Sequence, residues 1–462
     1  MTWSKDPASF RDHGGFVFRS DGVLYRQVNP VFAPHYDRLM QSGLYAALVR
    51  DGLMVAHDEV PIRMAEAPPA HAVLRPEPVP FISYPYEWCF SELKAAALLT
   101  LELQRRAIER NMTLRDASAY NVQFVGTRAI FIDTLSFGEY HEGTPWAAYR
   151  QFCEHFLAPL ALMAHAHHTL GGLARLHSDG VPLDLAASLL PVTTKARPGL
   201  LMHLHLHAKS ASKVDRNGRT PERAGGAMTR TAMLGLIDSL TRTVHNIDWK
   251  PPTTLWSAYD RHSNYSEGAQ TQKRRMVAEM LSAVTQAREP RSLWDLGANT
   301  GEYSRLAAAT GANVISLDGD HSVVEQNYRE SSSASANILP LVQDLRSPSP
   351  GTGWSNTERR SLIDRGPADV ALALALAHHL AIGANVPLDS VAAFFARVCR
   401  TLIIEFVPKS DSQIQRMLSL REDIFSDYTQ AAFEQAFDAH FKLIRSVQIE
   451  GTLRTLYLME HR

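Results

Sequence analysis

The C-terminal part of the chain alternates short apolar runs with longer segments of helical periodicity. Before the first run, Met276, Met280, Leu281 and Val284 recur at the spacing of one helix face. The apolar runs have the length of buried strands and read SLWDL, NVISLD, ILPLVQD, DVALALAL and TLIIEFV, at 292–296, 313–318, 338–344, 369–376 and 401–407. This regular alternation predicts a doubly wound α/β sheet with mostly parallel strands.

The last two strand candidates require a different arrangement. The segments FKLIRSVQI (441–449) and RTLYLME (454–460) are separated only by EGTL. A parallel pair needs a crossover of a dozen or more residues, so we expect these two strands to form an antiparallel hairpin.

A polar stretch marks the best candidate for a domain boundary. The residues KSASKVDRNGRTPERAGG, at 209–226, carry neither helical nor strand periodicity. A chain of 462 residues is long enough for two domains. We therefore expect an N-terminal domain over 1–208, a linker and connecting helix over 209–253, and a C-terminal domain over 254–462.

Composition narrows the classes of partner. The net charge of -1 gives no global basic field for nucleic acid. Cys89, Cys153 and Cys399 lie far apart, which argues against a disulfide scaffold or a structural zinc. The segment MTWSKDPASF has no apolar signal region, and runs such as VALALALA stop at about eight residues. We expect a cytoplasmic protein without a membrane span or a nucleic-acid partner.

Candidate chemistry is densest in SLWDLGANTGEYS (292–304), where the first strand turns into a helix. The turn runs from Asp295 through Gly297 and Asn299 to Gly301. Bare backbone and a helix N-terminus let a nucleotide-like ligand approach closely. The spacing is GxxxG rather than the GxGxxG that holds a dinucleotide, which disfavours a pyrophosphate ligand.

Acidic residues also end the next two strands. Asp318 follows the turn by about twenty residues, where a carboxylate can accept hydrogen bonds from both ribose hydroxyls. Asp344 ends the third strand. Because parallel strands end at one edge of a sheet, we expect Asp295, Asp318 and Asp344 to line one crevice.

These residues resemble the class I S-adenosylmethionine (SAM)-dependent methyltransferases, which have a Rossmann-like seven-stranded sheet with a reversed last strand. The resemblance covers about 254 to the C-terminus and implies SAM as cofactor, with Asp318 on the ribose and Asp344 on the adenine amino group. Asn299 stands where the family has a middle glycine. Tyr265 would fold over the sulfonium or serve as an ordinary packing aromatic.

The acceptor side of such a site would follow the fourth and fifth strands. The Asn/Asp-Pro-Pro-aromatic motif of amino-group methylators is absent there, and His378 and His379 stand in its place. A neutral imidazole could take a proton from a hydroxyl, while capping and packing roles are equally open. Glu405 ends the fifth strand, where it could contact substrate or orient a histidine. We expect a small-molecule or glycan-type acceptor.

The N-terminal half contains LRDASAYNVQFVGTRAIFID, at 114–133. Its spacing resembles the catalytic hairpin of protein-kinase-like and aminoglycoside-phosphotransferase-like folds. The resemblance implies Asp116 as proton acceptor and Asn121 and Asp133 as magnesium ligands beside ATP. The lysine of that family is absent unless Arg26 substitutes for it, and Leu114 replaces the usual histidine. An active phosphotransferase, a degenerate nucleotide binder and a structural hairpin all stay open.

Two histidine-rich segments, AHAHH at 164–168 and MHLHLH at 202–207, raise the question of a metal site. On a strand, His203, His205 and His207 would share one face, as metal ligands do. On a helix they would scatter over its surface, and no nearby acid or cysteine completes a ligand set. We assign no metal site from the sequence.

The leading hypothesis is SAM-dependent methyl transfer, with a kinase-like N-terminal domain that supports the reaction or recruits the substrate. The phrases DASAYNVQF, FIDTLSF and LHLHLHA resemble the family that includes rhizobial nodulation-type methyltransferases. One alternative is a magnesium- and ATP-dependent phosphotransferase with a SAM-sensing C-terminal domain. Another is a non-catalytic, ligand-dependent scaffold.

Overall fold

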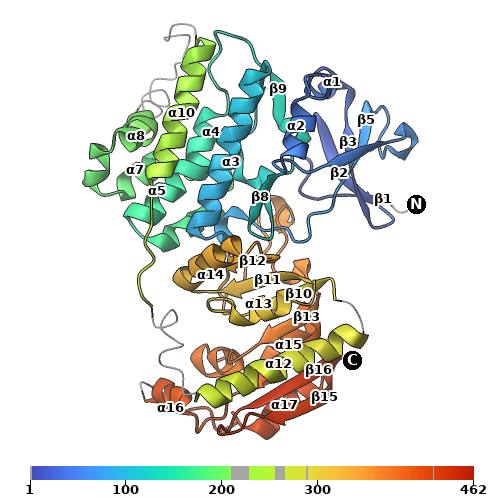
Figure 1. The fold of residues 1–462 in the computed structure, drawn as a ribbon, viewed down its shortest axis with the longest axis vertical. Helices are drawn as coiled ribbons and strands as arrows, with labels where there is room; N and C mark the ends of the chain where they lie inside the picture. The colour runs from blue at the N-terminus through green and yellow to red at the C-terminus, as the bar shows by residue number, and fades with distance from the viewer. Residues whose placement is uncertain (1–2, 210–227, 255–265, 288–289, 420) are drawn as a thin grey trace. The chain divides into compact units, whose positions relative to one another are not determined.

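The computed structural model describes residues 3–209, 228–254, 266–287, 290–419 and 421–462. The chain divides into two compact units, which are described separately. The first comprises 1–124, 128–250 and 352–359, and the second comprises 125–127, 251–351 and 360–462. Figure 1 colours both from the N-terminus to the C-terminus.

The first unit begins with a five-stranded sheet in the order β1-β2-β3-β5-β4, antiparallel throughout. Its strands are β1 (Trp3–Lys5), β2 (Gly15–Ser20), β3 (Val23–Val28), β4 (His57–Val60) and β5 (Ala72–Pro76). The turn between β2 and β3 is made by Asp21 and Gly22, both at positive φ. Helices α1 (Ala33–Gln41) and α2 (Leu44–Arg50) lie between β3 and β4 in the chain.

The rest of the first unit is mainly helical. Helix α3 (Phe90–Glu109) begins with a capping box in which Glu92 accepts from the N–H of Cys89. Two small antiparallel pairs follow it: β6 (Met112–Leu114) with β9 (Phe137–Glu139), and β7 (Val122–Val125) with β8 (Arg128–Phe131). The further helices are α4 (Tyr149–Phe152), α5 (Ala158–His165), α6 (Leu173–Leu176), α7 (Leu183–Leu189), α8 (Pro198–Leu200) and α10 (Arg230–Asn246), with π-helical η6 (Cys153–Leu157) and η9 (Leu201–Leu206).

The second unit is built on a mixed sheet whose described strands have the order β12-β11-β10-β13-β14-β16-β15. Strands β10 (Ser292–Leu296), β11 (Asn313–Asp318), β12 (Ile338–Val342), β13 (Ala368–Ala373) and β14 (Cys399–Phe406) are parallel. Strands β15 (Phe441–Gln448) and β16 (Thr455–His461) form an antiparallel hairpin joined to β14. The α/β class with mostly parallel strands is therefore confirmed.

Helices cover both faces of this sheet (Figure 1). On one face, α12 (Glu267–Ala287) and α13 (Glu302–Ala308) pack on Leu456 and Leu458 and their neighbours. Tyr457 points to the opposite face, because side chains alternate along a strand, and its ring lies 5.4 Å from that of Phe433 in α17 (Gln430–Asp438). The other helices of this unit are α14 (His321–Ser333), α15 (Leu388–Val398) and α16 (Ser412–Leu418).

Candidate functional site

The glycine turn lies at the carboxyl end of β10, next to the end of β11. The N–H groups of Gly297 and Ala298 both donate to the carbonyl of Leu317, at 2.8 and 3.0 Å. Gly297, Asn299 and Gly301 have φ values of 76°, 50° and 83°, in the left-handed region that glycine and asparagine tolerate best. The strand-to-helix turn expected from the sequence therefore has the backbone that its residues require.

Gly301 is required for close packing as well as for its backbone angle. A Cβ atom at this position would overlap the side-chain amide of Asn327, in helix α14. A side chain at 301 would therefore point into α14.

A buried chain of hydrogen bonds connects the turn to β11 and α14. Ser304 donates to the carboxylate of Asp295 at 2.6 Å and lies 2.9 Å from Ser316, which accepts from Asn327 at 2.7 Å. Asn327 in turn accepts from Ser331 at 3.0 Å. Burial raises the pKa of Asp295 to about 6. Sequence analysis missed Ser304 and Asn327, which hold this turn against α14.

Asp318 is tied directly to the glycine turn. One carboxylate oxygen accepts from the N–H of Asn299 at 2.9 Å, and the other accepts from the N–H of Asp320 at 2.9 Å. The residue as a whole is partly exposed, and burial of the carboxyl group raises its pKa to about 6. An acceptor with this placement can receive further donors from a polyhydroxylated ligand.

Asp344 lies beside Asp318 but already has a strong partner. The N–H of Gln343 donates to the carbonyl of Asp318 at 2.7 Å, which joins the ends of β11 and β12. The guanidinium of Arg346 donates to both carboxylate oxygens of Asp344, through Nε at 2.9 and 3.1 Å and through Nη2 at 2.7 Å. These bonds hold the pKa of Asp344 below its ordinary value.

The two histidines follow β13 through a strained turn. Ala375 has a φ of 52°, in the left-handed region that is strained for a residue other than glycine. The next residue, Leu376, packs close to the glycine turn, since a Cβ atom at position 297 would lie 3.2 Å from its side chain. His378 is buried, its ring lies 4.1 Å from that of His379, and its Nδ1 atom has no hydrogen-bond partner. Burial lowers the pKa of His379 to about 4 and holds that of His378 well below its ordinary value. Both imidazoles are therefore neutral at pH 7.

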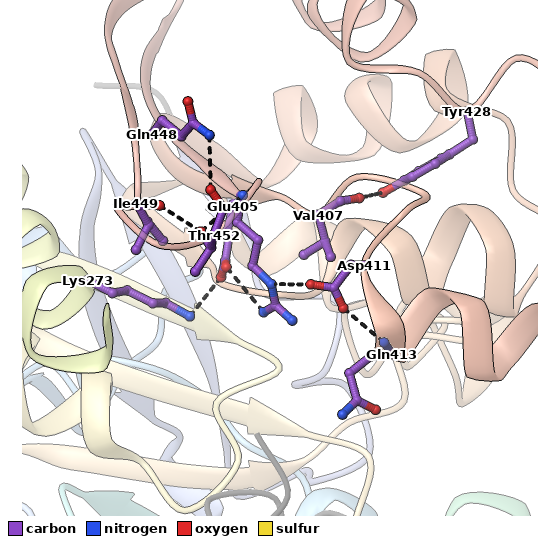
Figure 2. Close-up of polar contacts among 10 residues, drawn as sticks. Lys273, Glu405, Val407, Asp411, Gln413, Tyr428, Gln448, Ile449 and Thr452 are labelled. Atoms are coloured by element: carbon purple, nitrogen blue, oxygen red, sulfur yellow. Dashed lines mark hydrogen bonds and ion pairs between the residues drawn. The ribbon is translucent and has the colours of Figure 1, made fainter. Parts of the chain in front are cut away.

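Glu405 is fully buried at the end of β14, inside a network of charges (Figure 2). Lys273 of α12 approaches one carboxylate oxygen at 2.7 Å, and Arg454 approaches the other at 3.4 Å. Arg454 also bonds Asp411 at 2.8 Å. The charges of Arg454 and Lys273 contribute to the lowered pKa of His378. Glu405 thus anchors α12 and the start of β16 to the sheet.

In the first unit, the three residues of the predicted catalytic hairpin are close together. Asn121 donates to the hydroxyl of Ser136 at 3.1 Å, and that hydroxyl donates to Asp133. Asp116 is hydrogen-bonded to Asn121 and accepts from Gln151 at 2.7 Å. Burial raises the pKa of Asp116. Sequence analysis missed Ser136 and Gln151, which connect these side chains.

Arg26 of β3 places a positive charge beside this hairpin. Its Nη2 atom lies 2.5 Å from the carboxylate of Asp133, and both side chains are mostly buried. Asn121 therefore lies near two carboxylates, Asp116 and Asp133, and the guanidinium of Arg26 pairs with the second of them. A divalent ion would share Asp133 with this guanidinium.

The histidine-rich segment at 202–207 is helical, so the strand that would have aligned its side chains on one face does not form. Most of it lies in η9, where His203 is 2.8 Å from both Tyr149 and Ser239, and His205 is 2.9 Å from Thr194. Across the described residues, no three His, Cys, Asp or Glu side chains are grouped as a metal site would need.

Tyr265 lies outside the described residues. Among the helices that are described, none combines the length and apolar character needed to cross a bilayer.

The fold and this edge of the sheet define an α/β protein with a glycine turn and acidic strand ends. The chain is 37% identical over 468 residues to nodulation protein NoeA of Rhizobium meliloti strain 1021, over 98% of this chain and 95% of that protein. The chain therefore belongs to the NoeA family of nodulation proteins. No protein-family model matches it.

Solved structures with partial similarity include three that cover less than half of the chain. WbdD is 18% identical over 44% of this chain and 42% of its own, with a TM-score of 0.32. Magnesium protoporphyrin IX methyltransferase from Synechocystis PCC 6803 is 16% identical over 44% and 92%, with a TM-score of 0.32. N-methyltransferase NodS from Bradyrhizobium japonicum WM9 is 10% identical over 41% and 97%, with a TM-score of 0.31.

Proposed function

We propose that the second unit is a SAM-dependent methyltransferase that acts on a hydroxyl acceptor. The observation that carries the proposal is the hydrogen bond between Asp318 and the backbone of Asn299, since it joins an acidic strand end to the glycine turn. A dinucleotide is disfavoured because Asn299 occupies the middle position of the turn. Asp318 would accept the ribose hydroxyls, and Gly297 would leave the backbone open to the ligand.

The residues present suit SAM at most points. Asp318 is a partly exposed residue at the end of β11, and Asp295 beside the turn is positioned by Ser304. Bound SAM supplies an activated methyl group, so the protein has mainly to align the acceptor and exclude water. Asp344 would face the adenine amino group, although Arg346 donates to its carboxylate in the structure.

His378 and His379 are the proposed bases for the acceptor. Their lowered pKa values keep both imidazoles neutral, which is the form that accepts a proton. The unpartnered Nδ1 of buried His378 is an available acceptor position. Glu405 would act indirectly, because Lys273 and Arg454 neutralise its carboxylate and the same cations act on His378.

The experiment that tests the cofactor is isothermal calorimetry of the full chain with S-adenosylhomocysteine (SAH), SAM and NAD in separate titrations. Binding of SAH and SAM in a 1:1 complex, with none of NAD, supports the proposal. Binding of NAD in preference to SAH would remove it. Because ATP has its own proposed site, it is titrated separately, against the wild type and against the first-unit variant described next.

For the first unit we infer a reduced kinase-like fold that binds magnesium and ATP weakly and supports the methyltransferase. The contact between Arg26 and Asp133 favours this reading over rapid phosphotransfer, since the guanidinium competes with a metal for the same carboxylate. Asp133→Asn should abolish magnesium-dependent ATP binding and leave SAH affinity unchanged. An Asp116-dependent transfer of phosphate from ATP would instead support the phosphotransferase alternative.

A further inference from the structure

Arg346 occupies most of the acceptor capacity of Asp344. One oxygen accepts from the backbone N–H of Arg346 at 2.9 Å and from its Nε at 2.9 Å. The other accepts from Nε at 3.1 Å and from Nη2 at 2.7 Å. The one Nε hydrogen is shared between the two oxygens, so three N–H groups already donate to a carboxylate that offers about four acceptor positions.

The same ion pair lies at the surface of the protein. The side chains of Arg346 and Asp344 are 66% and 42% exposed, so water can replace either partner. Exposed pairs contribute only modest net stability, and two-pronged geometry makes this pair one of the stronger examples. The guanidinium can therefore leave Asp344 while the backbone N–H of Arg346 keeps the carboxylate in place.

We propose that Arg346 sets the affinity of the cofactor site by competing with the adenine amino group for Asp344. The inference rests on the proposed function, in which that amino group is the ligand of Asp344. An incoming N–H donor competes with the guanidinium, because Nε and Nη2 already donate to both carboxylate oxygens. Arg346 is thus a residue that weakens binding, although its charge and position would suggest a ligand-binding role.

A double-mutant cycle on the full chain tests this inference with SAH as the probe. SAH lacks the sulfonium charge of SAM, so the removal of an arginine does not simply relieve charge repulsion. Calorimetry would compare the wild type, Arg346→Ala, Asp344→Ala and the double variant. The matched control is Arg462→Ala, which removes an exposed arginine paired with Asp438 at the opposite edge of the sheet.

Arg346→Ala should bind SAH about two- to fivefold more tightly, the range that an exposed ion pair supports. The same substitution should have no effect in the Asp344→Ala background, and Arg462→Ala should match the wild type. Unchanged or weaker binding by Arg346→Ala, with SAH bound by the wild type, would overturn the competition while leaving the methyltransferase proposal intact. Failure of all four proteins to bind SAH would overturn both.

Discussion

The carboxylate of Asp318 accepts a hydrogen bond from the backbone N–H of Asn299, 2.9 Å away, so the end of β11 holds the glycine turn. Asp318→Ala removes that bond together with the proposed ribose acceptor. We expect SAH binding to weaken by about 1.5 to 3 kcal/mol, as for loss of a charged acceptor. Calorimetry measures this directly, and Asp318→Asn should fall between the two. Equal affinities in all three proteins would rule out the ribose assignment.

Substitution of two glycines with similar backbone angles distinguishes the cost of backbone strain from the cost of steric overlap. Gly301 and Gly311 have φ values of 83° and 86°, but only Gly301 faces a neighbouring side chain. Gly311→Ala should cost about 1 kcal/mol in the free energy of unfolding, from backbone strain alone. Gly301→Ala should cost at least about 2 kcal/mol more, because Asn327 must move. Urea unfolding of both variants checks the difference, and similar losses would contradict the packing described for Asn327.

The buried carboxyl of Asp295 should make the ligand-free protein less stable as pH rises. Its folded-state pKa of about 6 lies above the ordinary value of 3.8, so folding favours the protonated form. The resulting stability is complete below about pH 4 and is lost as pH rises through 6. Asp295→Asn mimics the neutral form and removes this loss.

We therefore expect Asp295→Asn to gain about 1 to 3 kcal/mol in stability relative to wild type between pH 4.5 and 7.5. Urea unfolding at the two pH values gives the change in the free energy of unfolding of each protein, and the change in the variant is then compared with that in the wild type. A difference between the proteins that stays constant with pH would show that Asp295 does not titrate in this range.

Glu405 should be far more important for stability than an exposed acid in a similar pair. Glu405→Gln leaves buried Lys273 and Arg454 without their shared counter-charge, so we expect a loss of about 3 to 5 kcal/mol in the free energy of unfolding. Asp438→Asn breaks the exposed pair with Arg462 and should cost less than about 1 kcal/mol. Chemical denaturation of both variants distinguishes the two, and a small loss for Glu405→Gln would argue that the network is solvated.

The histidine pair should be needed for turnover but not for cofactor binding. His378→Ala or His379→Ala should lower SAM-dependent methylation of a hydroxyl acceptor by roughly 10² or more, with SAH affinity retained. Because the pKa of His379 is about 4, the wild-type kcat should show no acid limb near pH 6.5. The assay measures the formation of SAH from SAM in the presence of a panel of hydroxylated glycans. Wild-type turnover in both variants would assign the pair to packing.

The strand ends were predictable because one rule places them. Parallel strands end at a common edge, so the order of Asp295, Asp318 and Asp344 along the chain was enough to bring them to one side of a sheet. Lys273 gave a weaker signal: it follows Ala269 by four residues and precedes Val277 by four, on the buried face of α12. A charge at such a position indicates a buried partner, but the sequence does not identify Glu405.

Other contacts depend on segments too distant for local pattern to join. His203 bonds Ser239 and Tyr149, which lie in other helices, so its surroundings could not be read from MHLHLH. Asn327 is on the buried face of α14, but the sequence does not identify Ser316, to which it donates, or Gly301, which packs against it.

Native mass spectrometry of the freshly purified full chain tests the central claim most directly. The account predicts that the wild type carries, or takes up on incubation, one molecule of SAM or SAH, and that Asp318→Ala loses it at the same ligand concentration. The account would be contradicted by a wild-type protein that takes up neither ligand, or by an Asp318→Ala variant that retains it fully.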